Sequence, residues 1–127
     1  MKIINLTQHA ATVSQQAAGI TDLPVEFQAA LVAAITFSND YNKTDLVMAA
    51  GVVVELLRDL AGGADISGQR VMIGGMPSFM PVLEVTLRNR GVEVGYAKSE
   101  RKSADMPQPD GSVRKVTEFV HAGMYWA

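Results

Sequence analysis

Apolar residues along the chain form two kinds of pattern, short unbroken runs and longer stretches with a helical period. The runs at residues 2–6 and 70–73 predict short strands covered on both faces, and residues 92–97 predict a third strand. The first strand leads directly into a cluster of polar side chains, formed by Asn5, Thr7, Gln8 and His9. We therefore expect a core strand that delivers polar groups to the end of a sheet.

Apolar positions with helical spacing predict four helices, at residues 13–18, from 22 or 24 to 37, from 44 or 45 to 61, and at 78–90. Thr12 has the position of an N-cap for the first helix, and Thr44 or Asp45 for the third. Glycines at 19, 62, 63 and 91 follow three of these helices, as is common where a helix ends. Pro77 suits the first turn of the last helix.

The C-terminal part of the chain differs from the rest. Residues 98–103 and 113–119 alternate in character, and the segment between them contains two prolines and an Asp-Gly turn. This pattern predicts a hairpin whose last strand runs antiparallel to the third strand. Strand–helix–strand order predicts parallel pairing elsewhere. The expected fold is α/β, a small three-layer Rossmann-like domain with a mostly parallel sheet and a C-terminal antiparallel hairpin strand.

In open parallel sheets, ligands bind beyond the carboxyl ends of the strands. We expect three segments to meet at this rim of the sheet: Thr7, Gln8 and His9 after the first strand, residues 74–78 after the second, and residues 98–101 after the third. The rim is therefore the predicted functional site.

Composition narrows the class of protein. The chain has 127 residues, which predicts a single domain over residues 1–127, and 48% of them are hydrophobic. A net charge of −2 argues against binding of duplex nucleic acid or of an anionic membrane. No residue is a cysteine, and the two histidines have no clustered acidic partners, so we expect no metal site and no cofactor. The absence of an apparent signal peptide favours a cytoplasmic location.

Of the three segments at the rim, the one after the second strand has the clearest features of a binding site. Gly74 and Gly75 allow close approach of a ligand to the backbone, and a helix beginning near Ser78 would direct free N–H groups at an anion. The alternative is that the two glycines only make a tight turn. The spacing matches neither a Walker A motif nor the dinucleotide-binding fingerprint.

Titratable groups at the rim have two interpretations as well. His9 is either a general acid or base or a hydrogen-bond donor to phosphate, or else a residue that caps the next helix or packs in the rim. The cations Lys98, Arg101 and Lys102, with the Ser99 hydroxyl beside them and Arg114 and Lys115 on the returning strand, predict a basic patch for a phosphate-bearing ligand, or else a solvated charged hairpin. For His121 we expect a structural role. Trp126 either covers the edge of the core or contacts a dimer partner.

Three stretches carry a resemblance: NLTQHAAT, IGGMPSFMPVLEVTLRNRGVEVGYAKSER and DGSVRKVTEFVHAG. They resemble a family of small proteins encoded in bacteria, phages and prophages. More loosely, the layout is similar to the small CRISPR-associated ring nucleases. That resemblance implies a homodimer that cleaves cyclic oligoadenylate second messengers without a metal, by attack of a ribose 2′-hydroxyl on the adjacent phosphate. It implies that Arg101 stabilises the developing charge, that His9 positions or protonates, and that Thr7, Ser78 and Ser99 are available at the site.

The leading hypothesis is therefore a dimer that binds a small nucleotide ligand such as a cyclic oligoadenylate, with catalytic residues His9, Ser99 and Arg101. Its predicted ligand-binding residues are Thr7, Gln8, Gly74, Gly75, Ser78 and Lys98. The sequence leaves open whether the ligand is cleaved or only sequestered. The alternative from another class is a phage or prophage accessory protein that acts through protein–protein contact.

Overall fold

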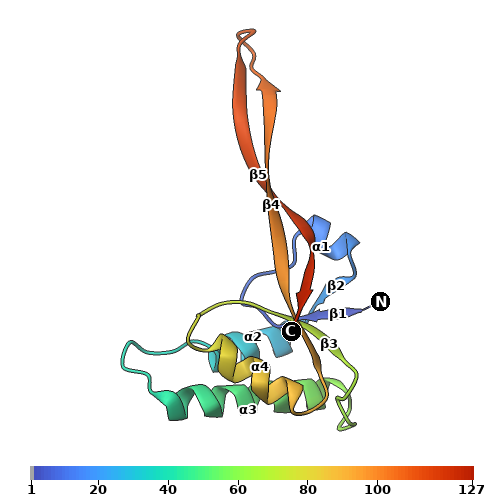
Figure 1. Ribbon diagram of the computed structural model, residues 1–127, viewed down its shortest axis with the longest axis vertical. Helices are drawn as coiled ribbons and strands as arrows, with labels where there is room; N and C mark the ends of the chain where they lie inside the picture. Colours follow the sequence, from blue (N-terminus) through green and yellow to red (C-terminus); the bar gives the residue numbers. More distant parts are fainter. Residues whose placement is uncertain (1) are drawn as a thin grey trace.

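The computed structural model describes residues 2–127. Its elements are the strands and helices β1 (Ile3–Asn5), α1 (Val13–Ala17), β2 (Ile20–Asp22), α2 (Val25–Ala34), α3 (Lys43–Leu60), β3 (Arg70–Ile73), α4 (Met80–Arg88), β4 (Glu93–Pro107) and β5 (Val113–Trp126). They build one five-stranded sheet in the order β2-β1-β3-β4-β5. The first four strands in this order are parallel to one another, and β5 is antiparallel to β4. The predicted Rossmann-like α/β class is confirmed (Figure 1).

The main core lies between the sheet and the three longer helices. Side chains from β1, β3 and β4, among them Ile4, Val71 and Val94, are buried against α2, α3 and α4. A smaller cluster on the opposite face contains Ile3, Ile20 and Met72. Because strands with both faces covered have no polar face, the runs of β1 and β3 are apolar at successive positions.

The long helix α3 begins at Lys43, before both of the predicted caps. Its N-cap is Asn42, whose side chain accepts a hydrogen bond from the backbone N–H of Asp45, while Asp45 reaches back to the Asn42 N–H. This reciprocal capping box satisfies two free backbone donors. The predicted caps, Thr44 and Asp45, therefore lie inside the first turn. Gly62 and Gly63 end the helix with positive φ, as expected.

Two other boundaries differ from the prediction. The strand β2 was not expected at all, because three residues between Gly19 and Pro24 show no periodicity. It exists because Ile20 pairs with Ile3 of β1 in the parallel ladder. The helix α4 begins at Met80, so Pro77 precedes it and Pro81 occupies its first turn.

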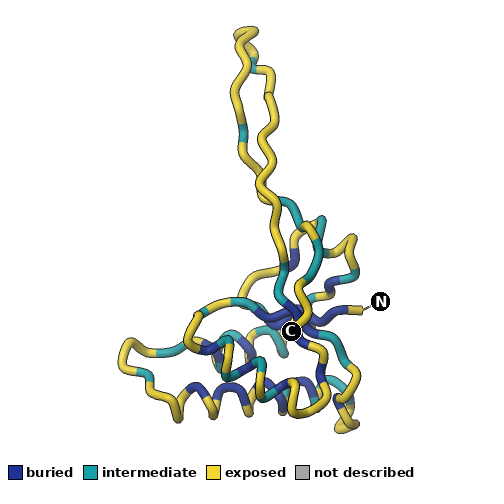
Figure 2. The backbone as a smooth tube through the Cα atoms, viewed as in Figure 1, coloured by how far each residue is buried: buried dark blue, intermediate teal, exposed yellow. Residues whose placement is uncertain are grey.

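The hairpin of β4 and β5 is far longer than the sequence suggests. β4 pairs with β3 only over 93–96, and from Ser99 outward it pairs with β5 alone. We call residues 99–121 the arm and the rest of the chain the body. The arm projects away from the body, and almost all of its residues are exposed (Figures 1 and 2). At its base, Trp126 packs on Gly95 and beneath the Arg70 guanidinium, and the side chain remains 38% exposed.

Candidate functional site

A cavity of about 620 Å³ opens at the carboxyl ends of the parallel strands. From β1 the chain passes through α1 to β2 on one side, and then through α2 and α3 to β3 on the other side of β1. The connections therefore diverge between β1 and β3, which is the place where open α/β sheets bind ligands. The polar and glycine residues that line the cavity include Thr7, Gln8, His9, Thr12, Gln15, Thr36, Gly74 and Gly75.

The loop after β1 is held in place from below by a buried asparagine. Asn5 is 3% exposed, and its Nδ2 donates to the His9 carbonyl oxygen and to Asp22 Oδ1, both at 2.8 Å. Its Oδ1 accepts from the Thr7 backbone N–H at 2.9 Å and from the Thr7 hydroxyl at 2.7 Å. Asp22 Oδ1 also accepts from the Ala11 N–H. The polar cluster after the first strand is thus a preorganised loop whose shape Asn5 and Asp22 fix.

His9 lies at the mouth of the cavity. Its side chain is exposed and lines the opening, while its backbone carbonyl is bound by Asn5. The capping alternative is wrong for this residue, because the cap of α1 is Thr12, in a capping box with Gln15. An imidazole on a fixed backbone at the mouth of a cavity is positioned to donate a proton to a bound ligand or to accept one from it.

The turn after β3 lines the cavity with the backbone of two glycines, Gly74 and Gly75. A Cβ at Gly74 would meet Thr7 Cγ2 at 3.6 Å, which places this turn directly beside the loop after β1. Gly75 has φ 144°, a conformation that favours glycine. Ser78, by contrast, does not line the cavity: its hydroxyl is 2.8 Å from the Tyr41 hydroxyl, with which it shares a hydrogen bond. The helix α4 begins two residues later than the anion hypothesis requires.

The wall of the cavity is apolar and was missed from the sequence. It is formed by Ile35, Phe37, Met72, Ile73, Met76, Phe79 and Met80. The first two belong to a segment predicted to be helical through residue 37, whereas α2 ends at Ala34 and the chain turns there to line the cavity. Gln8 Nε2 donates to the Ile35 carbonyl oxygen and connects this wall to the polar loop. Aromatic and methionine side chains of this kind accept flat apolar groups.

Tyr96 at the end of the β3–β4 pairing lines the same cavity. Its hydroxyl donates to Glu84 Oε1 at 2.9 Å. Burial, followed by this hydrogen bond and the charge of Glu84, raises the pKa of Tyr96 to about 12. The phenol therefore serves as a hydrogen-bond donor that stays neutral, not as a base.

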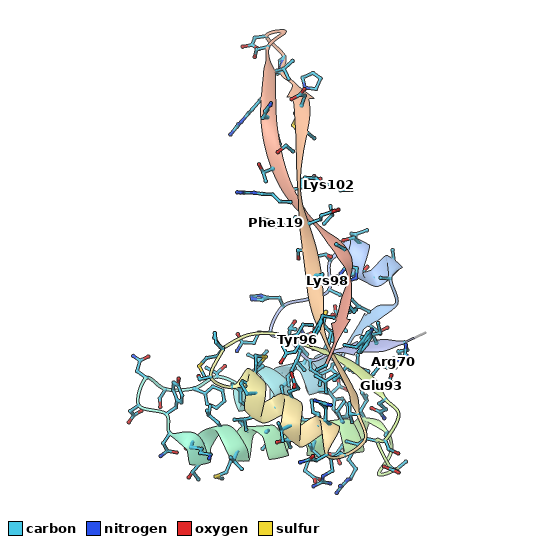
Figure 3. All side chains as sticks on the ribbon, in the orientation of Figure 1. Arg70, Glu93, Tyr96, Lys98, Lys102 and Phe119 are labelled. Atoms are coloured by element: carbon cyan, nitrogen blue, oxygen red, sulfur yellow. The ribbon has the colours of Figure 1, made fainter. Side chains whose placement is uncertain are left out.

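The predicted loop after the third strand is wrong. Lys98, Ser99 and Arg101 lie within β4, which continues without a turn until Pro107, and none of them lines the cavity. Ser99 pairs with His121 across the hairpin, and the Arg101 guanidinium lies 5.8 Å from the centre of the Phe119 ring. Lys98 lies at the base of the hairpin, and Phe119 and then Lys102 lie farther out along the arm (Figure 3).

The expected basic patch is therefore not formed at the rim. Arg114 and Lys115 pair with Met106 and Asp105 near the tip of the arm, at the end away from the cavity. The physical reason is the uninterrupted strand pairing of β4 with β5, which carries every charge beyond residue 98 outward. Within residues 2–127, no lysine or arginine lines the cavity.

No group of three or more histidine, cysteine, aspartate or glutamate side chains in residues 2–127 is arranged to hold a metal ion. Over the same residues, no helix has the length and apolar character that a membrane span requires.

Residues 1–124 match the model of the family described as "Uncharacterized protein MJ1673 family". The chain belongs to this family. The MJ1673 match includes the loop after β1, the turn after β3 and the whole arm. No curated protein and no solved structure matches the chain. The likeness to ring nucleases stays a prediction.

Proposed function

We propose that the cavity at the carboxyl ends of β1 and β3 binds a small nucleotide ligand, with a cyclic oligoadenylate second messenger as the first candidate. The observation that carries this proposal is the position of the cavity, at the point where the connections of a parallel sheet diverge. Its volume of about 620 Å³ lies within the usual range for small-molecule sites. This ligand would place the protein in the cytoplasm of a bacterial cell or a phage-infected host.

The chemistry of the lining supports a ligand with one flat apolar part and one polar part. The half-buried side chains of Phe37, Met76 and Met80 suit a nucleobase, and the buried Phe79 ring packs against Phe37. Thr7, Gln8 and His9 supply hydrogen-bonding groups on the opposite side, on a loop that Asn5 already holds in shape. Because ordering of this loop precedes binding, less conformational freedom is lost when the ligand binds.

The lining favours binding over rapid cleavage. Attack of a 2′-hydroxyl on a phosphate builds negative charge, which catalysts stabilise with cations or preorganised donors. Among the described residues that line the cavity there is no lysine or arginine, and His9 is the single histidine. Sequestration of the ligand is therefore the form of the proposal with the better support, and any turnover would depend on His9.

The test uses cyclic tetra- and hexa-adenylate with EDTA present. Calorimetric titration should give one binding event per chain. His9→Ala should weaken binding about tenfold or more because it removes a hydrogen-bonding group at the cavity mouth. Thr7→Val should weaken binding to a similar degree because it removes the hydroxyl that donates to Asn5 Oδ1 and so holds the loop in shape. Arg90→Ala, at an exposed position after α4, is the matched control and should bind as the wild type does. Arg101→Ala should do so too, because Arg101 lies in the arm.

Mass spectrometry of the same mixtures separates a sequestering protein from a nuclease. Intact ligand with measurable binding supports sequestration. Linear adenylates ending in a 2′,3′-cyclic phosphate, lost in His9→Ala, establish metal-independent cleavage. Absence of binding for both ligands would reject this ligand class for the cavity.

A second candidate function rests on the arm. An exposed hairpin of this length favours an accessory protein that acts through protein–protein contact, because an isolated two-stranded ribbon is only marginally stable without a partner. Removal of residues 99–121 distinguishes the two candidates. Nucleotide binding should survive this deletion if the cavity acts alone, whereas a contact function should be lost.

A further inference from the structure

The arm has two strands and two unpaired edges. Beyond Tyr96, β4 has no neighbour except β5, and β5 is the last strand of the sheet. Each edge presents a row of backbone N–H and C=O groups that can add another strand. Figure 2 shows the arm exposed along its length. The structure therefore contains a long template for strand addition outside its core.

The apolar residues of the arm are concentrated on β5. Phe119 is 71% exposed and Val113 is 62% exposed, and Val116 and Val120 lie on the opposite face of the same strand. β4 contributes fewer, and its Pro107 has no N–H to donate to a ladder. The edge of β5 is therefore the better surface for another strand.

The charges of the arm argue for a protein partner and against nucleic acid. The arm carries four cations (Arg101, Lys102, Arg114 and Lys115) and four carboxylates (Glu100, Asp105, Asp110 and Glu118), so that its net charge is zero. A surface that binds a phosphate backbone needs an excess of cations. Alternating charges of both signs instead suit a partner that carries the same alternation, which a second copy of this chain does.

One contact limits the stretch of β5 that is free. The backbone N–H of His121 donates to Ser14 Oγ of α1 at 3.3 Å, so α1 covers the edge of β5 at this residue. The free edge therefore runs over residues 113–120. A strand that adds to it must end before His121.

The alternation of side chains restricts how two copies of β5 can pair. In an antiparallel pair related by a two-fold axis, a given residue lies on the same face of the sheet in both copies. Because facing residues must also share a face, one residue near the middle of the strand has to face its own copy, and the axis passes between these two copies. Only Val116 or Thr117 lies near the middle of the free edge. With the axis at Thr117, Lys115 faces Phe119 and Val116 faces Glu118, which pairs charged with apolar side chains.

With the axis at Val116, the facing residues are complementary. Arg114 faces Glu118 of the second copy, Val113 faces Phe119 of the second copy, and Val116 faces itself. Opposite charges and apolar pairs at facing positions are the contacts that stabilise antiparallel strands. Within its own hairpin, Arg114 faces Met106 and no carboxylate. The second copy therefore supplies the acid that the hairpin does not.

We propose that two copies of this chain join through their arms, by antiparallel pairing of β5 with β5 about a two-fold axis at Val116. The pairing extends the sheet from one body to the other through two arms. It leaves both cavities open, since the arm residues do not line them. The proposal concerns the arm alone and does not depend on what the cavity binds.

Cross-linking tests the register, because the chain has no cysteine of its own. Val116→Cys should form a disulfide-linked dimer under mild oxidation, since facing residues of adjacent strands lie within disulfide reach. Ala104→Cys is the matched control: Ala104 pairs with Val116 on the same face but belongs to β4. In the dimer its two copies are separated by three strand spacings, so it should stay uncross-linked. Efficient cross-linking at Ala104 in place of Val116 would overturn the proposal.

Charge reversal tests the pairing without a covalent bond. In sedimentation velocity, Arg114→Glu should weaken the dimer about tenfold or more, because it places like charges opposite each other at two symmetry-related sites. Adding Glu118→Arg should restore most of the affinity. Arg101→Glu reverses a charge on β4 and should have little effect. A wild-type chain that remains monomeric at ~100 µM, or a dimer unaffected by Arg114→Glu, would refute the arm interface.

Discussion

Replacement of Asn5 by alanine tests whether one buried amide holds the cavity loop. The wild-type side chain takes part in four hydrogen bonds, two as donor to the His9 carbonyl and Asp22, and two as acceptor from Thr7. A net contribution of about 1 kcal/mol for each gives about 4 kcal/mol if no water replaces the lost bonds. The groups of Thr7 and His9 lie near the surface and can bind water in the variant. We therefore expect a loss of about 2–3 kcal/mol in the free energy of unfolding.

Urea denaturation followed by circular dichroism measures this loss. Asn39→Ala is the control, because Asn39 is exposed in the loop before α3 and should change the free energy of unfolding by less than about 0.5 kcal/mol. If Asn5→Ala costs no more than this control, the loop does not depend on Asn5. The hydrogen bonds of Asn5 would then form as a result of folding without stabilising the folded state.

Asn5→Asp sharpens the same test because it preserves shape. The variant puts a second carboxyl group 2.8 Å from Asp22 Oδ1, where the amide donated before. Two adjacent carboxylates repel, so the folded pair holds a proton more tightly than the unfolded chain does. Folded proteins with such a pair bind more protons than unfolded ones, and their stability falls as pH rises. The deficit of Asn5→Asp relative to the wild type should therefore be larger at pH 7 than at pH 4; a deficit independent of pH would contradict the contact.

Two further predictions concern a helix cap and a phenol. Asn42→Ala should lower the free energy of unfolding by about 1 kcal/mol and Thr44→Ala by less than about 0.5 kcal/mol, in urea denaturation; the reverse order would move the start of α3 to the residue that the sequence suggested. The pKa of Tyr96 is raised from 10.0 to about 12, so the folded state holds the phenol proton more tightly than the unfolded chain does. The protonated phenol therefore contributes fully to stability below about pH 10, and this contribution is lost as pH rises through 12. The wild type should therefore lose stability relative to Tyr96→Phe between about pH 10 and pH 12, and parallel urea midpoints across that interval would show that Glu84 does not hold the phenol.

The candidate site was partly predictable from the sequence. Thr7, Gln8, His9, Gly74 and Gly75 line the cavity as expected, because polar and glycine residues after buried parallel strands fall at one edge of the sheet. The apolar wall was not predictable. Its residues look like core residues in the sequence, and only the end of α2 at Ala34 turns part of them toward the cavity.

Long-range contacts explain the remaining differences. The hydrogen bond between Asn5 and Asp22 joins residues 17 positions apart, and no local pattern announces it. The strand β2 has three residues and exists through its pairing with β1. The alternation in residues 98–103 indicated a strand, but whether that strand stayed on the body or continued outward depended on its pairing partner. Because β4 continues outward paired with β5, Lys98, Ser99 and Arg101 lie in β4 and not at the predicted site.

What the sequence determined by itself is the set of segments and their local conformation. Apolar runs, helical periods, capping residues and the Asp-Gly turn act over a few residues, and the backbone responds to them wherever the segment lies. Only the tertiary structure decided which strands became neighbours, where the connections diverge to leave a cavity, and which charges surround it. Those outcomes depend on contacts between residues distant in the chain, whose free energy no short stretch of sequence contains.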